Sequence, residues 1–354
     1  MGGTLGVSSP VDIAPWSDVT KPTAPQGSFD EFSSLVERPP VMADKITSST
    51  VQTTEPLSDS PANVRNLIVV GFSTMHSSQT AVTWAATEAE RRMAGLHIVH
   101  AYPLPQLGQP VQHDVDDLLR NEACTLLDRI ADSTRRDHPQ LEITTRLIQG
   151  APVNALRDES AAAALTVVGA KESGRLTQAF LGSVASAVAA AHPAPVAVVH
   201  PDHPTNRHGP VVVGIDEYGG SSAAIDFAFA EAAVRDTELV AVHAWNRSMF
   251  EVSLPDSSPL LDPTATEQEE TAVLAEALAG PRGKYPDVVV TPAVRRGEAA
   301  TVLLDYSHSA SVVVVGRRPR GEFEALIMGS TSRSVTAHSQ CPVVIVHSPD
   351  TEHS

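Results

Sequence analysis

The chain has 354 residues, of which 42% are hydrophobic but only 4% aromatic, and 42 acidic against 25 basic side chains give it a net charge of −17. This length predicts about two domains, and an aliphatic core is typical of parallel strands buried beneath helices. The acidic balance argues against nucleic acid and anionic membrane surfaces as partners, because both repel a negatively charged protein.

Residues 1–62 differ in composition from the rest of the chain. They are rich in Ser, Thr and Pro, carry more acidic than basic side chains, and show no sustained apolar period. Such a segment cannot bury enough apolar surface to offset the entropy of ordering it. We therefore expect an acidic disordered tail, with a short docking motif around Trp16 or Phe29–Phe32 as the alternative.

Targeting signals and cysteines bear on the compartment. The first residues lack the basic and apolar stretches of a secretory signal, and the apolar runs of the chain are short for a membrane span. Cys124 and Cys341 lie far apart and form no CxxC or Cys/His metal spacing. The sequence therefore predicts a cytoplasmic protein without a metal site.

From Asn66 onward the chain repeats itself. LIVVG at 67–71 recurs as PVVVG at 210–214, and APVAVVH at 194–200 recurs as CPVVIVH at 341–347. The offset is 143 residues for the first pair (71 to 214) and 147 for the second (200 to 347). A repeat of this length indicates duplicated domains rather than a solenoid. We expect domains at 63–202 and 208–348, joined by a polar linker.

Strand and helix patterns alternate within each copy. In the first copy the expected strands are Leu67–Val70, Leu96–Ala101, Leu141–Ile148, Leu165–Val168 and Val196–Val199. The expected helices between them are Ser77–Met93, ending at Gly95, then Val115–Ser133, Val153–Ala163 and Ser183–Ala191. The second copy follows the same order. This alternation predicts an α/β fold with two tandem, Rossmann-like domains, each a five-stranded parallel sheet.

Two glycines frame a loop after the fourth strand of each copy, Gly169 and Gly182 in the first and Gly316 and Gly329 in the second. The second glycine of each pair is followed by serine and a helix. A helix start offers unpaired N–H groups and a positive dipole end, which together bind phosphate. Asp216, at the tip of the first strand of the second copy, is placed to accept a hydrogen bond from a ribose hydroxyl.

These residues resemble the universal stress proteins, whose nucleotide motif is G-x2-G-x9-G-(S/T) after an apolar strand. The resemblance covers about 64–202 and 208–348 and is similar to the tandem members of actinobacteria. It implies an adenine-nucleotide sheet, ATP with Mg as ligand, and pairing of the two domains through their terminal strands, Val196–His200 and Val343–His347. The binding residues that it implies are Asp216, Ala244, Gly316, Arg317, Gly329, Ser330, Thr331 and Ser332 in the second copy and Gly169, Gly182 and Ser183 in the first.

Both copies depart from the motif. In the first, Glu172 replaces the second motif glycine, and a carboxylate about 4 Å from a phosphate costs up to about 4 kcal/mol; Ser73 replaces the family's Asp. In the second, Pro319 replaces the glycine and removes one N–H donor. The same loop carries three cations that favour a polyphosphate, Arg317, Arg318 and Arg320. The second copy is therefore the better nucleotide candidate.

No catalytic constellation is visible: GxSxG, HExxH and Cys/His pairs are absent from the sequence. His100 and His243 recur at one position of the second strand and are interpreted as core residues. The predicted function is an ATP-binding sensor or regulator in the stress response. The alternatives are a nucleotide-free scaffold that acts through protein contacts and a slow ATPase. Homo-oligomerisation is left open.

Overall fold

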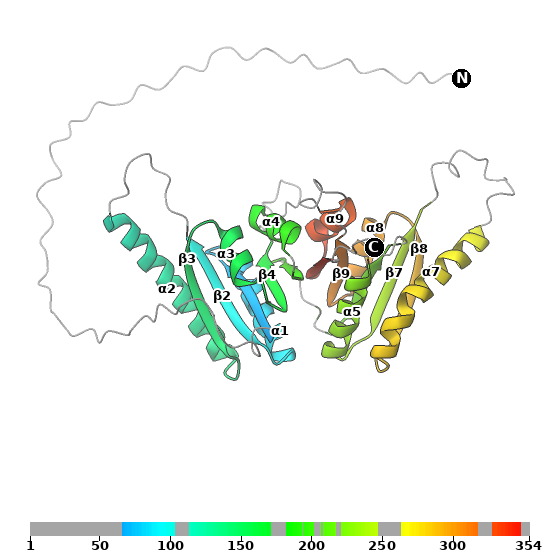
Figure 1. The fold of residues 1–354 in the computed structure, drawn as a ribbon, viewed down its shortest axis with the longest axis horizontal. Helices are drawn as coiled ribbons and strands as arrows, with labels where there is room; N and C mark the ends of the chain where they lie inside the picture. The colour runs from blue at the N-terminus through cyan, green and yellow to red at the C-terminus, as the bar shows by residue number, and fades with distance from the viewer. Residues whose placement is uncertain are drawn as a thin grey trace, which may run out of the picture. The chain divides into compact units, whose positions relative to one another are not determined.

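The computed structural model describes residues 66–102, 113–170, 182–192, 194–201, 206, 208–216, 221–246, 263–317 and 328–347. Within them, strands and helices alternate in the predicted order (Figure 1). The expected N-terminal tail lies outside the described residues. So do Glu172 and Pro319, on which the departures from the nucleotide motif rest, and Arg318 and Arg320.

Each domain repeats the same sequence of elements. Domain 1 consists of β1 (Leu67–Phe72), α1 (His76–Arg91), β2 (Gly95–Tyr102), α2 (His113–Asp137), β3 (Ile143–Gln149), α3 (Pro152–Glu159), β4 (Leu165–Gly169), α4 (Ser183–Ala191) and β5 (Val196–Val199). Domain 2 consists of β6 (Val211–Ile215), α5 (Ser222–Arg235), β7 (Leu239–Trp245), α7 (Pro263–Lys284), β8 (Val290–Arg296), α8 (Ala299–Ser307), β9 (Val312–Arg317), α9 (Ser330–His338) and β10 (Val343–His347). The predicted α/β fold with two Rossmann-like domains is confirmed.

The end of α1 differs from the prediction. The helix ends at Arg91, and Met93 adopts the left-handed conformation, with φ 51°. Gly95 is already the first residue of β2, and a Cβ on it would lie 3.2 Å from the Leu67 side chain. Gly95 therefore serves the close approach of β2 to β1, and it does not end the helix. Asp236, with φ 50°, makes the corresponding turn after α5.

The described strands form one ten-stranded sheet in the order β3-β2-β1-β4-β5-β10-β9-β6-β7-β8. All neighbouring strands in it are parallel except β5 and β10. That antiparallel pair places Val198 opposite Val343 and Val196 opposite Ile345. The predicted pairing of the two domains through their terminal strands is thus confirmed. In each domain the strand order reverses between the first and fourth strands, which is where ligands bind in sheets of this kind.

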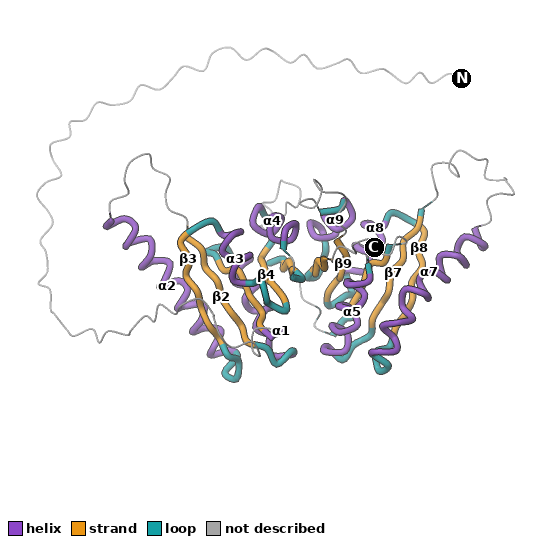
Figure 2. Tube along the Cα trace, viewed as in Figure 1, coloured by secondary structure: helices purple, strands orange, loops and turns teal. Residues whose placement is uncertain are grey.

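Helices cover both faces of the sheet (Figure 2). Successive strand residues point to opposite faces, so Val70 packs in the core beneath α1 and α2, whereas Val69 packs with Leu156 of α3. The helices α1, α2, α5 and α7 contribute to the first layer, and α3, α4, α8 and α9 to the second. Strands buried on both faces explain the aliphatic composition. Among the described helices, none has the length and apolar character needed to cross a membrane.

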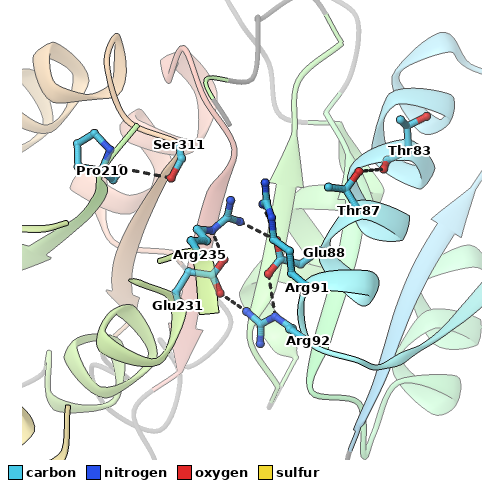
Figure 3. Close-up of polar contacts among 9 residues, drawn as sticks. All are labelled: Thr83, Thr87, Glu88, Arg91, Arg92, Pro210, Glu231, Arg235 and Ser311. Carbon is cyan, nitrogen blue, oxygen red and sulfur yellow. Dashed lines mark hydrogen bonds and ion pairs between the residues drawn. The ribbon is translucent and has the colours of Figure 1, made fainter. Parts of the chain in front are cut away.

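Four charged side chains join α1 to α5 across the seam between the domains (Figure 3). Arg92 donates from Nε to Glu88, at 2.8 Å, and from Nη2 to Glu231. Arg235 donates from Nη2 to Glu88, at 2.7 Å, and from Nε to Glu231. Each arginine thus bonds the glutamate of its own domain and that of the other, which closes a ring that we call the interdomain quartet.

The interdomain quartet follows the symmetry of the repeat. Its glutamates lie 143 residues apart (88 to 231), as do its arginines (92 to 235). Arg92 stacks over the Phe227 ring at 5.3 Å, and Arg235 over the Trp84 ring at 6.0 Å. Burial by itself would raise the pKa of Glu88, but the charges of Arg235 and Arg92 hold that pKa below its ordinary value. Glu88 is therefore ionised and neutralised across the seam.

Candidate functional site

Domain 1 contains a cavity of about 600 Å³ at the carboxyl ends of β1, β2 and β4. Its walls come from these strand ends, from α3 and from the first turns of α1 and α4. The described lining residues are Gly71, Phe72, Ser73, Met75, Ser77, Ser78, Val99, Ala101, Pro152, Leu156, Val168, Gly169, Ala170, Gly182, Ser183, Val184 and Ala185. The cavity lies at the reversal of strand order and has the volume of a small-molecule site.

The lining of this cavity is uncharged as far as the described residues form it. Its apolar wall includes Val99, Leu156 and Val168, and four serine hydroxyls lie among the polar lining groups. None of the described lining residues has a side chain that is ionised at neutral pH. The cavity therefore offers shape, hydrogen bonds and apolar surface, but no side-chain charge from these residues.

The first turn of α4 contributes backbone donors to the cavity. Gly182 precedes the helix with φ −57° and ψ 154°, and no side chain of the described residues caps it. The first helical bond is donated by Ser186 N–H to Gly182 O, at 2.9 Å. The N–H groups of Ser183, Val184 and Ala185 precede that bond, so the helix itself supplies them with no acceptor. All three residues line the cavity.

Gly169 has a packing role that does not depend on a ligand. A Cβ at this position would lie 2.7 Å from the backbone oxygen of Ser77, at the start of α1. Only glycine allows β4 and α1 to approach so closely. The structure therefore places Gly169 beside the cavity and also accounts for it by the fold.

In domain 2 the end of β9 meets the first turn of α9. Ser332 Oγ donates to Gly316 O at 3.1 Å, which ties these elements together. The structure thereby brings into one place the residues expected around the phosphates, Gly316, Arg317, Gly329, Ser330, Thr331 and Ser332. Ala244 lies near the end of β7, beside β6, and Asp216 directly follows β6. The predicted residues thus lie at the same edge of the sheet.

The packing of the fold requires glycine at position 169 but not at position 329. Gly329 precedes α9 with φ −57° and ψ 156°, a conformation open to any residue. A Cβ built on Gly329 would meet no atom within 4 Å. Neither backbone strain nor packing explains this glycine, and its effect is to leave open space in front of the helix start.

Arg317 is a buried cation for which the described residues supply no ion-pair partner. The residue is 4% exposed, and its Nε has no hydrogen-bond partner. No residue in the described part of the chain forms an ion pair with it, and burial lowers the pKa of its guanidinium. A buried, unneutralised charge is costly, so the domain 2 site favours an anion.

The side chain of Arg317 starts on the α8/α9 face of the sheet. Alternate residues of β9 share a face, and Val313 and Val315 pack with Leu303 of α8 and Val335 of α9. The counterpart of Arg317 in domain 1 is Ala170 (offset 147), which lines the cavity. Arg317 therefore starts from the position in domain 2 that corresponds to the cavity wall of domain 1.

The loops after β1 and β6 are built alike around different residues. In domain 1, the hydroxyls of Ser73 and Ser78 are 2.7 Å apart and hydrogen-bonded. In domain 2, Ser221 Oγ donates to Asp216 Oδ1 at 3.1 Å and accepts from Asp216 N–H at 3.0 Å. Asp216 is exposed at the tip of the strand. Domain 2 thus presents a carboxylate where domain 1 presents a hydroxyl.

His100 and His243 are core residues, as predicted. Both are buried, and their Nδ1 atoms bond to the carbonyls of Phe72, at 2.9 Å, and Ile215, at 3.0 Å. Each imidazole therefore ties the second strand of its domain to the first. The described residues include no group of three or more His, Cys, Asp or Glu that is placed to hold a metal ion.

Sequence reasoning missed most of the cavity wall in domain 1. Leu156, Val99 and Val184 are aliphatic residues without a motif, and their role depends on the packing of α3 and α4 on the sheet. Ala101 could have been found, because it corresponds to Ala244 in the repeat (offset 143).

A duplicated sheet with glycine-led helix starts at its points of strand reversal defines a tandem protein of two Rossmann-like domains. The model of the Universal stress protein family matches residues 65–200 and 208–347. The chain belongs to this family.

Individual relatives agree with this assignment. Universal stress protein Rv2623 of Mycobacterium tuberculosis is 35% identical over 291 residues, which cover 78% of this chain and 95% of the relative. Universal stress protein Rv2005c of the same organism is 34% identical, with 78% and 96% covered. A crystal structure of a universal stress protein from Archaeoglobus fulgidus superposes with a TM-score of 0.60, covering 80% of this chain and 98% of that one. At 18% identity, that likeness shows the fold alone.

Proposed function

We propose that this protein binds ATP in domain 2 and acts as a nucleotide-responsive regulator, without strong catalytic activity of its own. One observation carries the proposal. The start of α9 is led by Gly329, where a Cβ would meet no atom within 4 Å, and the end of β9 beside it carries the buried, unpaired Arg317. Open space, backbone donors and an unneutralised cation are together what a phosphate group requires.

The residues of domain 2 have distinct roles in this proposal. The first turn of α9, with the hydroxyls of Ser330 and Thr331, donates hydrogen bonds to phosphate oxygens. Ser332 acts indirectly, because its hydroxyl is bonded to Gly316 O and holds the helix against β9. Asp216 accepts from a ribose hydroxyl, and Ala244 leaves room for the base. ATP would bring its own Mg²⁺.

The proposal reconciles an anionic ligand with an acidic protein. The chain as a whole carries a charge of −17, which slows the approach of an anion over a distance. Inside the site, however, Arg317 supplies a buried positive charge, and burial strengthens its attraction for an anion. A cytoplasmic location, where ATP is abundant, belongs to the same proposal.

Calorimetric titration of the full chain with Mg-ATP tests the proposal. We expect saturable binding by the wild type that is lost in Gly329→Glu and weakened in Ser330→Ala. The matched variants of domain 1, Gly182→Glu and Ser183→Ala, should retain the binding. A wild type without saturable heat would overturn the proposal in favour of a nucleotide-free scaffold.

The same variants distinguish a regulator from an enzyme. Release of phosphate from ATP is measured for the wild type and for Ser330→Ala under saturating nucleotide. We expect turnover no faster than the background of the assay in both. Turnover that Ser330→Ala abolishes would instead assign the protein as a slow ATPase.

A further inference from the structure

The two candidate sites differ most at one pair of equivalent positions. Ala170 directly follows β4 in domain 1, and Arg317 is the last residue of the equivalent strand β9 in domain 2. Both side chains start on the same face of the sheet. Ala170 contributes only a methyl group to a cavity whose described lining is uncharged. Arg317 contributes a buried guanidinium that no described residue neutralises.

The described lining of the domain 1 cavity matches an uncharged ligand that is apolar at one end and polar at the other. The apolar wall of the cavity includes Val99, Leu156 and Val168. Three of the described lining serines lie between the end of β1 and the first turn of α1, and Ser183 lies with the helix donors at the start of α4. An apolar ring system with hydroxyl groups at one end, as in a nucleoside, matches this arrangement and fits the volume of about 600 Å³. A triphosphate would place several negative charges beside described lining residues that carry no positive charge in return.

We propose that positions 170 and 317 divide the two sites by ligand charge, so that domain 1 binds an uncharged, nucleoside-sized molecule and domain 2 binds a phosphate-bearing one. The part that concerns domain 2 rests on the proposed function. The part that concerns domain 1 rests only on the cavity.

We expect the fold not to require the charge at position 317. Burying a charge without a partner costs free energy, and even buried ion pairs can often be replaced by apolar side chains of similar volume without loss of stability. A residue kept for its ligand should therefore leave the unliganded fold intact when it is replaced. The stability of the unliganded variant therefore distinguishes a residue that selects the ligand from one that holds the fold together.

The first experiment assigns each ligand to a site in the full-length protein. Adenosine and Mg-ATP are titrated separately by calorimetry into the wild type, Ala101→Phe and Ala244→Phe, which fill equivalent positions of the two domains. We expect Ala101→Phe to abolish adenosine binding and to retain ATP binding, and Ala244→Phe to do the reverse. Adenosine that binds nowhere, or ATP that Ala101→Phe displaces, would overturn the proposal.

The second experiment exchanges the charge. Arg317→Met should weaken ATP binding at least tenfold while the melting temperature without ligand stays the same or rises. Ala170→Arg should weaken adenosine binding at least tenfold and raise the ATP stoichiometry from one to two. If Ala170→Arg does not fold, Ser183→Arg places the cation at an exposed lining position and should have the same effect. Ala170→Gln is the uncharged control and should not gain ATP.

Different results would refute the proposed function and the charge selectivity of the two sites. A wild type that binds no ATP refutes the proposed function, and the adenosine titrations still decide the assignment of domain 1. ATP binding that survives Arg317→Met unchanged, or a loss of melting temperature in that variant, refutes the role given to position 317.

Discussion

The helix starts of α4 and α9 show how two copies of one fold diverge. Both are led by glycine and serine, with φ −57° at each glycine and ψ values of 154° and 156°. The side chains that surround these starts differ, since Ala170 stands opposite Arg317 in the repeat. Backbone donors are common to both candidate sites. In the proposal made above, they mark the place of a ligand and the side chains beside them decide its charge.

The largest effect is expected where the two domains are most alike, in the interdomain quartet. Arg235→Met leaves Glu88 and Glu231 buried with one guanidinium between them, which should lower the free energy of unfolding by about 3–5 kcal/mol. Arg92→Met, the matched change in domain 1, should cost less, because the Arg92 side chain is 16% exposed and that of Arg235 only 1%. Urea unfolding followed by circular dichroism measures both. A larger loss for Arg92→Met would contradict the inequality of the two arginines.

An intermediate loss of stability is expected for a glycine that packing requires, Gly169, but not for Gly329 at the candidate site. Gly169→Ala places a Cβ 2.7 Å from the Ser77 backbone oxygen, and such overpacking should cost about 1–3 kcal/mol. Gly329→Ala meets nothing within 4 Å, and its free energy of unfolding should stay within about 0.5 kcal/mol of the wild type. The two variants are compared by urea unfolding. Equal losses would show that both glycines are structural.

The smallest expected effect is a pH dependence of the folding stability that arises from His192 of domain 1, for which domain 2 has no equivalent histidine. Burial lowers the pKa of His192, which accepts or donates a hydrogen bond with Ser160 at 2.6 Å. As the pH falls below about 6.5, the unfolded chain takes up this proton before the folded one, so stability is lost with a slope of at most about 1.4 kcal/mol per pH unit. The counterpart in domain 2 is Ser339 (offset 147).

His192→Ser, which installs the domain 2 residue, should remove this part of the pH dependence. The readout is the change of melting temperature between neutral pH and about pH 5, because the variant also loses the bond to Ser160. A slope identical to that of the wild type would exclude His192 as its source.

The order of elements could be predicted because it follows from local patterns, and the joining of the domains was implied by the family resemblance. Apolar runs and helical spacing identify the strands and helices, and the repeat fixes their number in each copy. The terminal strands Val196–Val199 and Val343–His347 are apolar edges, which favours pairing. The turn at Met93 could not be predicted, because an exposed methionine at positive φ has no sequence signal.

The site could be predicted only where glycine marks the backbone. Gly182 and Gly329 indicate the helix starts, but nothing in the sequence shows that Gly169 is required by the close approach of α1 to β4. The interdomain quartet was missed for a similar reason. Glu88 and Arg92 are four residues apart on one helix, which is typical of an exposed ion pair. Only the contact of α1 with α5 makes them a buried ring.

The antiparallel seam between β5 and β10 has a genetic consequence. In a symmetric dimer of identical chains, one mutation alters both halves at once. Here the two domains are encoded one after the other in a single chain. A mutation at one position therefore leaves the equivalent position of the other domain unchanged. Pairs that must match across the seam, such as Glu88 and Glu231, remain the same residue in both halves. Pairs that lie away from the seam at the candidate sites, such as Ala170 and Arg317, can differ between the halves.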